Sequence, residues 1–240
     1  MTSRLPYARL SEFYDVGWGD FAESSLRFVA STFKDHGIQA GSILELACGT
    51  GILAIHLAST GHTVLGLDRS PEMVALAREK GQELGNVDFQ VADMRAFNLT
   101  SKFDAVICLF DSINYLTEIR DVQTTIASIS SVLNHGGLFV FDFNRPIIYS
   151  AYSGDTVRRC VENGILLQEL HYEAEGRIAR TVFRFPSGDV ETHLQRAYEL
   201  DEIEPLLAAA GLLLDGCFSD FSRRAVSSVS ERLICVCEKP

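Results

Sequence analysis

The chain reads Ile-Leu-Glu-Leu-Ala-Cys-Gly-Thr-Gly from Ile43 to Gly51. A short apolar run that ends in closely spaced glycines is typical of a buried strand that turns directly into a helix. A second apolar run begins at Val64 and ends in Asp68. Asp68 lies about 20 residues after Gly49, the separation expected for a carboxylate that accepts the hydroxyl groups of a ribose. The two strands therefore predict an α/β sheet that holds a nucleoside at their carboxyl ends.

The residues of this turn indicate which kind of nucleoside to expect. Gly49 and Gly51 stand where the backbone must approach a ligand without a Cβ atom in the way, and the helix that starts at Ile52 directs its N–H groups to the same place. Residues 49–54 also satisfy the Gly-x-Gly-x-x-Ala pattern of dinucleotide-binding folds. Glu45 argues against that alternative, because a carboxylate inside the first strand is unfavourable beside a pyrophosphate and compatible with a ligand that carries an ammonium group.

The segment Glu45–Gly51, together with Leu67–Met73, resembles the first two motifs of class I S-adenosylmethionine-dependent methyltransferases. Val91–Met94 resembles the third motif, in which the acidic side chain faces the adenine amino group and its neighbour packs on the base. Residues 103–115 resemble the fourth strand with its following loop, and residues 133–142 resemble the turn before the fifth strand. The resemblance implies the following residues for binding S-adenosyl-L-methionine: Tyr14, Glu45, Ala47, Gly49, Gly51, Asp68, Arg69, Met73, Asp93, Met94 and Phe110.

The alternation of strands and helices predicts a Rossmann-like, doubly wound α/β fold, with a mostly parallel seven-stranded sheet and helices on both faces. We expect residues 1–240 to form a single domain in which residues 1–40 make an N-terminal helical lid. The helical region over residues 10–33 is expected to be interrupted near Gly17 and Gly19. Strands are expected at residues 43–47, 63–67, 87–91, 105–110, 138–143, 212–218 and 232–238, and helices from residue 52, from residue 71, over 118–133 and over 201–210.

Residues 150–198 have a different pattern. Stretches that mix β-branched and charged residues at 164–172 and 177–185 are separated by the turn sequences Glu-Gly-Arg and Pro-Ser-Gly-Asp. This pattern predicts antiparallel strands joined by hairpins. A small sheet inserted after the fifth strand would cover the carboxyl ends of the parallel strands, where open α/β sheets bind ligands. We therefore expect residues 150–198 to roof the acceptor pocket.

Methyl transfer from a sulfonium requires the protein to align the acceptor with the methyl group and to exclude water, and aromatic faces stabilise the positive charge. Asp111 orients an amine or takes its proton in one interpretation, and caps its loop through Ser112 and Asn114 in another. His171 and His193 lie in the predicted insertion, where one faces the pocket as a base or both point outward. The candidates for catalytic roles are Asp111, Tyr14, Tyr115 and His171.

The resemblance implies S-adenosylmethionine-dependent methyl transfer to a small-molecule acceptor by in-line displacement. An amine nitrogen is favoured over a hydroxyl oxygen, because Phe110–Tyr115 resembles the strand-four region of bacterial small-amine and natural-product N-methyltransferases. Three alternatives remain open at this point: an O-methyltransferase of a small hydroxylated metabolite, an NAD-dependent oxidoreductase, and a non-catalytic nucleoside-binding protein.

The composition limits the partners. A formal net charge of −11 argues against nucleic acid, whose phosphates require clustered Lys and Arg. No apolar stretch approaches the ~20 residues that span a bilayer, and the chain start lacks an apolar signal segment, so we expect a cytoplasmic protein with no membrane partner. The 6 cysteines contain no Cys-x-x-Cys pair, so we expect buried thiols and no metal site. A homodimer is compatible with the sequence, which does not fix the oligomeric state.

Overall fold

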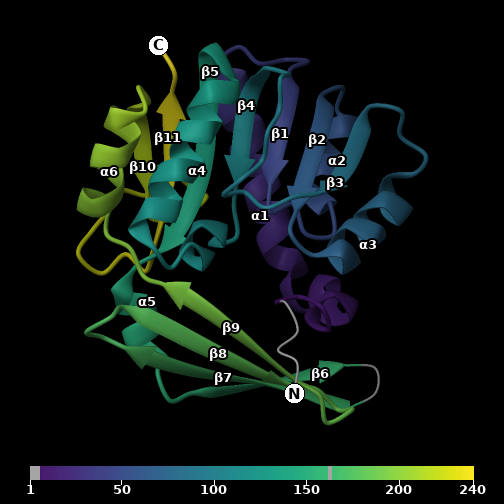
Figure 1. Ribbon diagram of the computed structural model, residues 1–240, viewed down its shortest axis with the longest axis vertical. Coiled ribbons are helices and arrows are strands. Elements are labelled where there is room, and N and C mark those ends of the chain that lie inside the picture. Colours follow the sequence, from purple (N-terminus) through teal and green to yellow (C-terminus); the bar gives the residue numbers. More distant parts are fainter. Residues whose placement is uncertain (1–5, 162–163) are drawn as a thin grey trace.

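The computed structural model describes residues 6–161 and 164–240, which form two β-sheets with their helices. The larger sheet has 7 strands in the order β10-β11-β5-β4-β1-β2-β3, and the smaller sheet has 4 strands in the order β6-β7-β8-β9. Figure 1 shows the larger sheet in the upper part of the molecule and the smaller sheet below it. Residues 1–5 of the predicted lid and residues 162–163 of the predicted insertion lie outside the described residues.

The larger sheet is mostly parallel. Strand β1 pairs with β2 and β4, β2 pairs with β3, and β4 pairs with β5, all in parallel, whereas β11 runs antiparallel to β5 and β10. This arrangement confirms the predicted Rossmann-like, doubly wound sheet. Its strands are β1 (Ser42–Leu46), β2 (Thr63–Asp68), β3 (Val87–Val91), β4 (Phe103–Cys108), β5 (Leu133–Asn144), β10 (Leu213–Phe218) and β11 (Arg232–Glu238).

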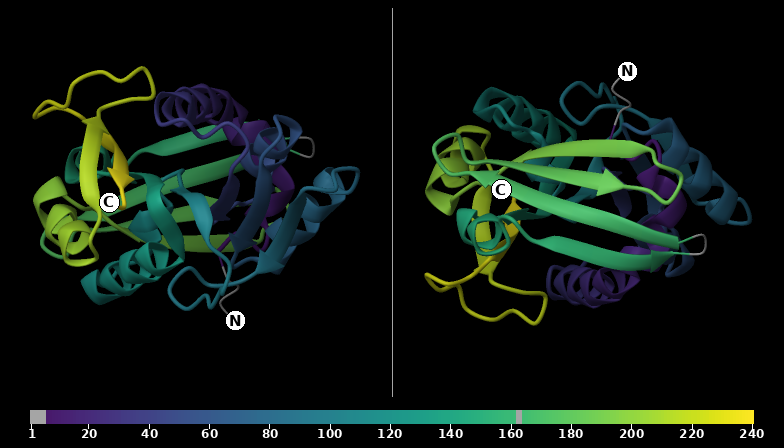
Figure 2. Two further views of the ribbon diagram at one scale, coloured as in Figure 1. Left: turned by 90° about the horizontal axis from the view of Figure 1, so that it is seen from above. Right: turned by 90° about the horizontal axis from the view of Figure 1, so that it is seen from below.

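Helices cover both faces of this sheet, as the view from above in Figure 2 shows. The central strand β1 is buried on both sides, since Leu44 packs in the hydrophobic cluster of one face and Ile43 in that of the other. Parallel strands between two helix layers require such a nearly continuous apolar run. In the described part of the chain no helix is long and apolar enough to cross a membrane. One face carries α4 (Ile119–Val132) and α6 (Leu200–Ala209), and the other carries α1 (Tyr14–Asp35), α2 (Ile52–Ser59) and α3 (Pro71–Gly81).

Local signals fix the start of α3, where the prediction is confirmed. The Ser70 hydroxyl accepts a hydrogen bond from the backbone N–H of Met73 at 3.2 Å, and Pro71 occupies the first helical position. The Ser70 hydroxyl satisfies a backbone N–H that has no partner within the helix, and Pro71 has no N–H that would need one. Both residues therefore stabilise the helix start. The carboxyl edge of the sheet next to α3 is thereby held in place.

The interruption predicted in the N-terminal helix is wrong. Helix α1 runs unbroken from Tyr14 to Asp35 through both glycines of this region. A glycine costs about 1 kcal/mol in a helix interior. Phe28 and Phe33 of the same helix are each 2% exposed, and the apolar area that they bury stabilises the helix by more than the glycines destabilise it. Packing has therefore overridden local propensity.

Strand β4 ends two residues before the predicted boundary. Phe110 and Asp111 have left-handed backbones, with φ of 63° and 49°, and residues other than glycine adopt this conformation rarely. The backbone therefore leaves the sheet ladder after Cys108 and turns into the short 3-10 helix η2 (Ser112–Tyr115). Phe110 and Asp111 lie at the carboxyl edge of the sheet and not inside it.

The chain between β5 and α6 forms the second sheet, which is antiparallel throughout. In the view from below in Figure 2 it spreads across the carboxyl ends of the core strands. Asn114 ties it to the core, because its amide donates to the carbonyls of Asn144 at 2.9 Å and Arg196 at 2.7 Å. The elements are α5 (Pro146–Ala151), β6 (Thr156–Val161), β7 (Gly164–Glu173), β8 (Ile178–Arg184) and β9 (Val190–Arg196), and η1 (Leu10–Phe13) precedes α1.

The cysteines are mostly packed in the interior. Cys48, Cys108, Cys235 and Cys237 are buried, as the sequence analysis predicts. Cys160 is exposed, so the prediction is wrong there. It lies on β6, which forms one edge of the small sheet.

Candidate functional site

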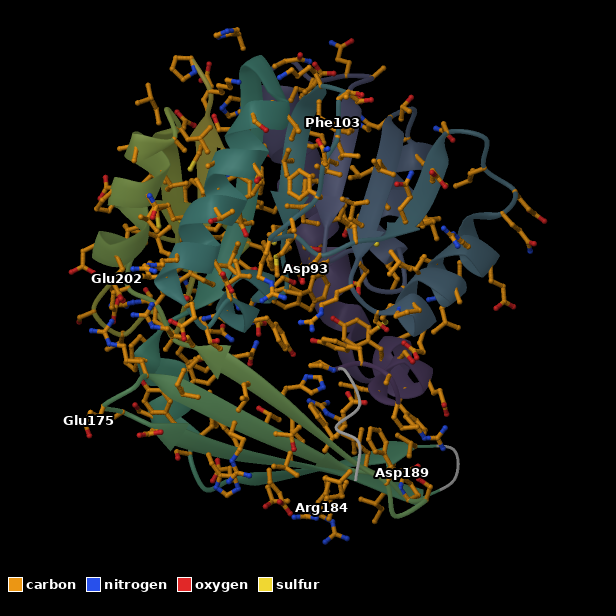
Figure 3. The ribbon with its side chains drawn as sticks, in the orientation of Figure 1. Asp93, Phe103, Glu175, Arg184, Asp189 and Glu202 are labelled. Atoms are coloured by element: carbon orange, nitrogen blue, oxygen red, sulfur yellow. The ribbon has the colours of Figure 1, made fainter. Side chains whose placement is uncertain are left out.

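Two adjoining hollows open at the carboxyl edge of the parallel strands. The larger hollow has a volume of about 140 Å³ and the smaller hollow one of about 90 Å³. Figure 3 shows Asp93, which lines the larger hollow, in the space between the two sheets, whereas Phe103 lies at the opposite end of the core. Four aromatic residues line both hollows and mark their junction: Tyr7, Tyr14, Phe110 and Tyr115.

All but one of the residues predicted to bind the methyl donor line the larger hollow. The exception is Gly51, which has a φ of 80°. A Cβ atom at Gly51 would lie 2.7 Å from Cζ of Phe89 and 3.0 Å from Cβ of Ala77. The glycine is therefore required for packing α2 against the sheet and α3, and its expected role in letting a ligand approach stays a prediction. The residues that line the hollow are Tyr14, Glu45, Ala47, Gly49, Asp68, Arg69, Met73, Asp93, Met94 and Phe110.

The turn after β1 is held by the carboxylate that ends β2. Asp68 accepts the backbone N–H of Gly49 at 2.9 Å on one oxygen and that of Ser70 at 2.8 Å on the other. Burial raises the pKa of Asp68, although these N–H groups lower it. Ala47 has a left-handed φ of 55°, and a Cβ at Gly49 would meet nothing nearer than Tyr14 at 3.9 Å. The backbone at Gly49 is thus accessible from the hollow.

Glu45 is the buried acidic group of the larger hollow. Its side chain sits in the middle of β1, and the residue is 5% exposed. Burial raises its pKa to about 8, while a hydrogen bond from the backbone of Ala54 lowers it. Its Oε2 atom has no hydrogen-bond partner. An unsatisfied buried carboxylate oxygen is costly, so this atom fits a cationic ligand group that donates a hydrogen bond to it.

The acidic residue after β3 has cationic partners on both sides. Asp93 accepts hydrogen bonds from Arg95, at 2.6 Å from Nη2 and 3.0 Å from Nε, and Nε of Arg69 lies 3.8 Å away. The hydrogen bonds from Arg95 hold the pKa of Asp93 below its ordinary value. An ionised carboxylate offers about four acceptor positions, so Asp93 can still accept from a ligand amine. Met94 follows it in the lining of the hollow.

Asp111 has a structural partner that neither interpretation of the sequence included. One oxygen accepts from Nη2 of Arg232 at 2.8 Å, and the other accepts from Nε2 of Gln195 at 2.6 Å. Arg232 also pairs with Asp142, and burial raises the pKa of Asp142 to about 6. Asp111 makes no side-chain cap of η2. Since both oxygens already hold donors, the residue suits charge balance at the smaller hollow better than proton abstraction.

Tyr115 and Tyr14 contribute phenol groups to the junction of the hollows. The Tyr115 hydroxyl lies 2.7 Å from that of Tyr7 and 2.7 Å from Nδ1 of His193. Tyr14 packs edge-on against Tyr7 with ring centroids 5.7 Å apart. Burial raises the pKa of Tyr14 and Tyr115 above the ordinary phenol value, so both remain protonated at neutral pH.

The structure places His171, the histidine that was predicted to be catalytic, away from both hollows. His171 is exposed on β7 and belongs to the lining of neither hollow. His193 on β9 is 2% exposed and lines the smaller hollow. Strand β9 buries the side chains of Glu191, His193 and Gln195, whereas Leu194 is 48% exposed. In a sequence, a strand whose inner face is polar has the same alternating pattern as a strand whose outer face is polar. The sequence alone therefore does not show that these polar residues line the hollow.

Sequence reasoning therefore missed several polar residues of the smaller hollow and of its support. The available signal was the recurrence of polar side chains at every second position of residues 191–195. The residues missed are Glu191, Gln195, Gln168, Thr181, Asp142 and Arg232.

Comparisons with known proteins agree with this geometry. Residues 43–137 match the family model described as a methyltransferase domain. A glycine/sarcosine N-methyltransferase of Parasynechococcus marenigrum (strain WH8102) is 36% identical over 217 residues, which cover 87% of this chain and 75% of the relative. A dTDP-3-amino-3,6-dideoxy-alpha-D-glucopyranose N,N-dimethyltransferase of Streptomyces fradiae is 31% identical over 220 residues, covering 86% and 84%. The crystal structure of an S-adenosylmethionine-dependent methyltransferase from Clostridium acetobutylicum ATCC 824 has the same fold, with a TM-score of 0.85, 23% identity and coverage of 97% and 98%.

Proposed function

The chain belongs to the class I S-adenosylmethionine-dependent methyltransferases, and on that basis we propose that its acceptor is the nitrogen of a small amine. Family membership removes the NAD-dependent oxidoreductase and the non-catalytic binding protein from the alternatives. The observation that carries the proposal is the charge of the smaller hollow. Among its described lining residues Asp111 is a carboxylate and none is Lys or Arg. Such a lining favours a cationic or neutral reacting group over an anionic one at this position.

The larger hollow fits the methyl donor. We assign the ammonium group of the donor to the unsatisfied Oε2 of Glu45, and the ribose hydroxyls to Asp68. Asp93 and Met94 would take the adenine, through a hydrogen bond from its amino group and through packing on its ring. When bound, S-adenosylmethionine supplies a methyl group on a positively charged sulfur that departs as a neutral thioether.

The protein's own contribution is orientation and exclusion of water. Tyr7, Tyr14, Phe110 and Tyr115 stand where the two hollows meet, and their ring faces stabilise positive charge there. The inserted sheet closes the smaller hollow from the far side, with Phe183 and Gln195 in its lining. Holding acceptor and methyl group in line supplies most of the rate acceleration that such a displacement needs.

The choice of nitrogen over oxygen also agrees with the relatives. The two described above are named for methylation of glycine and sarcosine and for dimethylation of an amino sugar nucleotide. These acceptors differ in size but share an aliphatic amine. We propose that the acceptor of this chain also carries an aliphatic amine, and the assay below identifies the rest of the acceptor.

The test is methyl transfer from S-adenosylmethionine to matched acceptors, followed by mass spectrometry. The amines are glycine, sarcosine and dTDP-3-amino-3,6-dideoxyglucose, and the matched control is the dTDP-6-deoxy sugar that has a hydroxyl in place of the 3-amino group. We expect methylation of at least one amine and none of the hydroxyl sugar. Methylation of the hydroxyl sugar without any amine would replace this proposal with O-methylation.

The remaining expectations stay predictions. They are the lid function of residues 1–40, the roof function of residues 150–198, a cytoplasmic location, the absence of a nucleic-acid partner, and a homodimer as one compatible oligomeric state.

A further inference from the structure

Four polar side chains form a continuous hydrogen-bonded chain beside the smaller hollow. The hydroxyls of Tyr7 and Tyr115 are 2.7 Å apart, and the Tyr115 hydroxyl is 2.7 Å from Nδ1 of His193. Nε2 of His193 is 2.6 Å from Oε1 of Glu191. The chain connects the N-terminal turn, η2 and β9, and its two phenols line both hollows. It therefore leads from the junction of the hollows to a buried carboxylate.

The hydrogens of this chain have a single consistent direction. Burial tends to raise the pKa of Glu191, but hydrogen bonds from His193 and from the backbone N–H groups of Arg9 and Tyr7 lower it overall. An ionised carboxylate only accepts, so Nε2 of His193 carries the hydrogen and Nδ1 is left as an acceptor. Tyr115 then donates to Nδ1 and accepts from Tyr7, so every hydrogen points toward Glu191.

The phenols transmit a proton and do not keep the resulting charge. Burial raises the pKa of both Tyr7 and Tyr115 well above that of an ordinary phenol. A phenolate at either position is therefore unfavourable near neutral pH. The imidazole of His193 can accept a proton on Nδ1 while Nε2 donates to the carboxylate of Glu191, which fixes the tautomer.

We propose that the Tyr7–Tyr115–His193–Glu191 chain removes the proton from the protonated amine acceptor before methyl transfer. This inference rests on the proposed function. The N–H bond of the ammonium group breaks and its proton goes to the Tyr7 oxygen, the Tyr7 proton passes to Tyr115, and the Tyr115 proton goes to Nδ1 of His193. The nitrogen keeps the electron pair of its broken bond, which is then available for the methyl group. Glu191 is a positioning residue, because it acts through His193.

Methyl transfer to an amine requires that the amine first lose a proton, which this hydrogen-bonded chain can accept. An alkylammonium group with a pKa of about 10, like that of lysine, is about one part in a thousand deprotonated at pH 7. Only that small fraction has a free lone pair. A positioned base that works near neutral pH contributes about 100-fold to 10,000-fold.

Glu191 is the charged group nearest to His193, and most of the other side chains packed around His193 are uncharged. Strand β8 contributes Thr181, opposite His193 in the register, and Phe183, whose ring centroid is 4.9 Å away. Gln168 of β7 and Gln195 of β9 line the same hollow. Asp111 acts on the two phenols, whose pKa its charge raises. The guanidinium of Arg9 pairs with Glu12 and lies 3.6 Å from Asp189.

The first measurement is the tautomer of His193 in the free protein, read from its ring ¹⁵N chemical shifts at pH 8.5. We expect hydrogen on Nε2 and none on Nδ1, and we expect the Glu191→Gln variant to lose this preference. A His193 that carries its hydrogen on Nδ1 would overturn the proposal. This measurement needs no substrate, so it decides the direction of the chain independently of the acceptor.

The second measurement is the pH dependence of kcat/KM from pH 6 to pH 10, with the amine that the wild type turns over. The His193→Asn variant keeps an acceptor oxygen near the position of Nδ1 but cannot hold a proton. We expect its kcat/KM to fall about 100-fold or more at pH 7 and by much less at pH 10, where the amine loses its proton to solvent. Affinity for S-adenosylhomocysteine should remain unchanged, which shows that the variant is folded.

The matched control is His171→Gln, which changes an exposed histidine of the same sheet outside both hollows. Its pH profile should equal that of the wild type. A His193→Asn variant whose rate is reduced by the same factor at every pH would show a purely structural role and sink the relay. If the wild type methylated no amine, the proposed function would fail, while the tautomer measurement would still decide whether the chain is built to accept a proton.

Discussion

The two hollows are built from contacts of very different range. In the larger one, Asp68 binds the backbone of Ser70, 2 residues away, and of Gly49, 19 residues away. In the smaller one, Tyr115 binds His193 across 78 residues, and Glu191 binds the backbone of Tyr7 across 184. Both sites are polar and largely buried, but only in the first do these hydrogen bonds stay within two neighbouring strand-turn-helix units. The sequence separation of the contacts, and not the type of residue, therefore decides which site residues can be predicted from the sequence.

The comparison has an energetic side as well. The backbone of the larger hollow is fixed by turns and helix starts that form with nearby residues. The smaller hollow depends on Arg232, which joins the carboxylates of Asp111 and Asp142 from the last strand of the chain. Its geometry therefore forms only when the whole fold is complete.

Replacing Arg232 by methionine should have the largest effect. The variant leaves the buried carboxylate of Asp142 and the partly exposed carboxylate of Asp111 without their cation, and breaking a buried pair such as Arg232–Asp142 costs about 3–5 kcal/mol of the free energy of unfolding. Without Arg232 the pKa of Asp142 should rise above its present value of about 6. The loss should consequently be smaller at pH 5, where the Asp142 carboxyl of the variant is neutral, than at pH 8. Urea unfolding at both pH values measures it.

The control for this variant is Arg224→Met. Arg224 is 76% exposed in its side chain and pairs with Asp220 at 3.3 Å. Its replacement should leave the urea midpoint unchanged. Equal stability of Arg232→Met and the wild type at pH 8 would show that the smaller hollow does not depend on this buried cluster.

Asp68→Ala should weaken binding of S-adenosylhomocysteine about 100-fold, since it removes a charged acceptor worth about 1.5–3 kcal/mol and frees the Gly49 turn. Asp68→Asn should lose less, because its amide oxygen still accepts one hydrogen bond. Calorimetric titration gives both affinities. His193→Asn belongs to the other hollow and should leave the affinity within about twofold of the wild type. A similar loss in His193→Asn and Asp68→Ala would mean that the hollows are not separable.

Gly51→Ala should destabilise the fold by about 2 kcal/mol, because a Cβ there meets Phe89 and the backbone is left-handed. The contact distance of 2.7 Å involves a ring buried between sheet and helix, which has little room to move. The control is Gly85→Ala, where a Cβ would meet nothing within 4 Å. Thermal unfolding of the two variants compares them. If Gly51→Ala kept full stability and lost only ligand affinity, the packing role would be refuted and the ligand-approach prediction supported.

Binding of the methyl donor should release a proton from Glu45. Its pKa in the protein is about 8, so it is mostly neutral at pH 7 and must ionise to pair with the donor's ammonium. Affinity should therefore rise about 25-fold from pH 6 to pH 8 and fall above it, where the ligand's α-amino group, with a pKa of about 8, loses its own proton. Calorimetry in buffers of different ionisation enthalpy counts the protons. In Glu45→Gln the release should vanish, and an unchanged release would assign it elsewhere.

The raised pKa of Glu45 also affects stability, with a definite sign. The folded state holds this proton up to about pH 8, whereas the unfolded state releases it near pH 4.5. Glu45 therefore contributes stability that is fully present below the lower value and is lost as the pH rises through the higher one. As the pH rises between these two values, the stability of Glu45→Gln should increase relative to that of the wild type. Urea unfolding at several pH values measures this difference.

Arg184→Ala should have the smallest effect. Arg184 pairs with Glu169 at 2.9 Å on the outer part of the small sheet, with 49% of its side chain exposed. Solvent and salt screen such a pair, so the melting temperature should not shift measurably. Figure 3 shows Arg184 away from the space between the sheets. A clear loss of stability would indicate that the insertion is held from its outer face as well.

Most of the core could be predicted from particular local signals. The apolar run before Gly49 gives β1, and the Ser70–Pro71 pair gives the start of α3. The end of β4 could not be predicted, because the left-handed backbones of Phe110 and Asp111 leave no mark in an apolar sequence. The unbroken α1 also escaped prediction, since its glycines suggest a break that burial of Phe28 overrides.

The residues of the smaller hollow were the hardest to predict from the sequence. Residues 191–195 alternate as any strand does, and the pattern does not say which face turns inward. His171 and His193 looked equivalent, yet one is exposed and the other is buried beside Glu191. The choice between them is made by the register of β9 against β8 and by the position of the sheet under the core.

Local patterns in the sequence predict the fold class, the succession of the core strands along the chain and many of the residues that line the larger hollow, because parallel strands bring their carboxyl ends to one edge and short turns hold each side chain there. The lining of the smaller hollow follows from the folded structure and not from any local pattern. Its contacts join Tyr7, Tyr115, His193 and Arg232 from distant parts of the chain. Such contacts form only after loop closure and packing have fixed register and orientation, which no local pattern encodes.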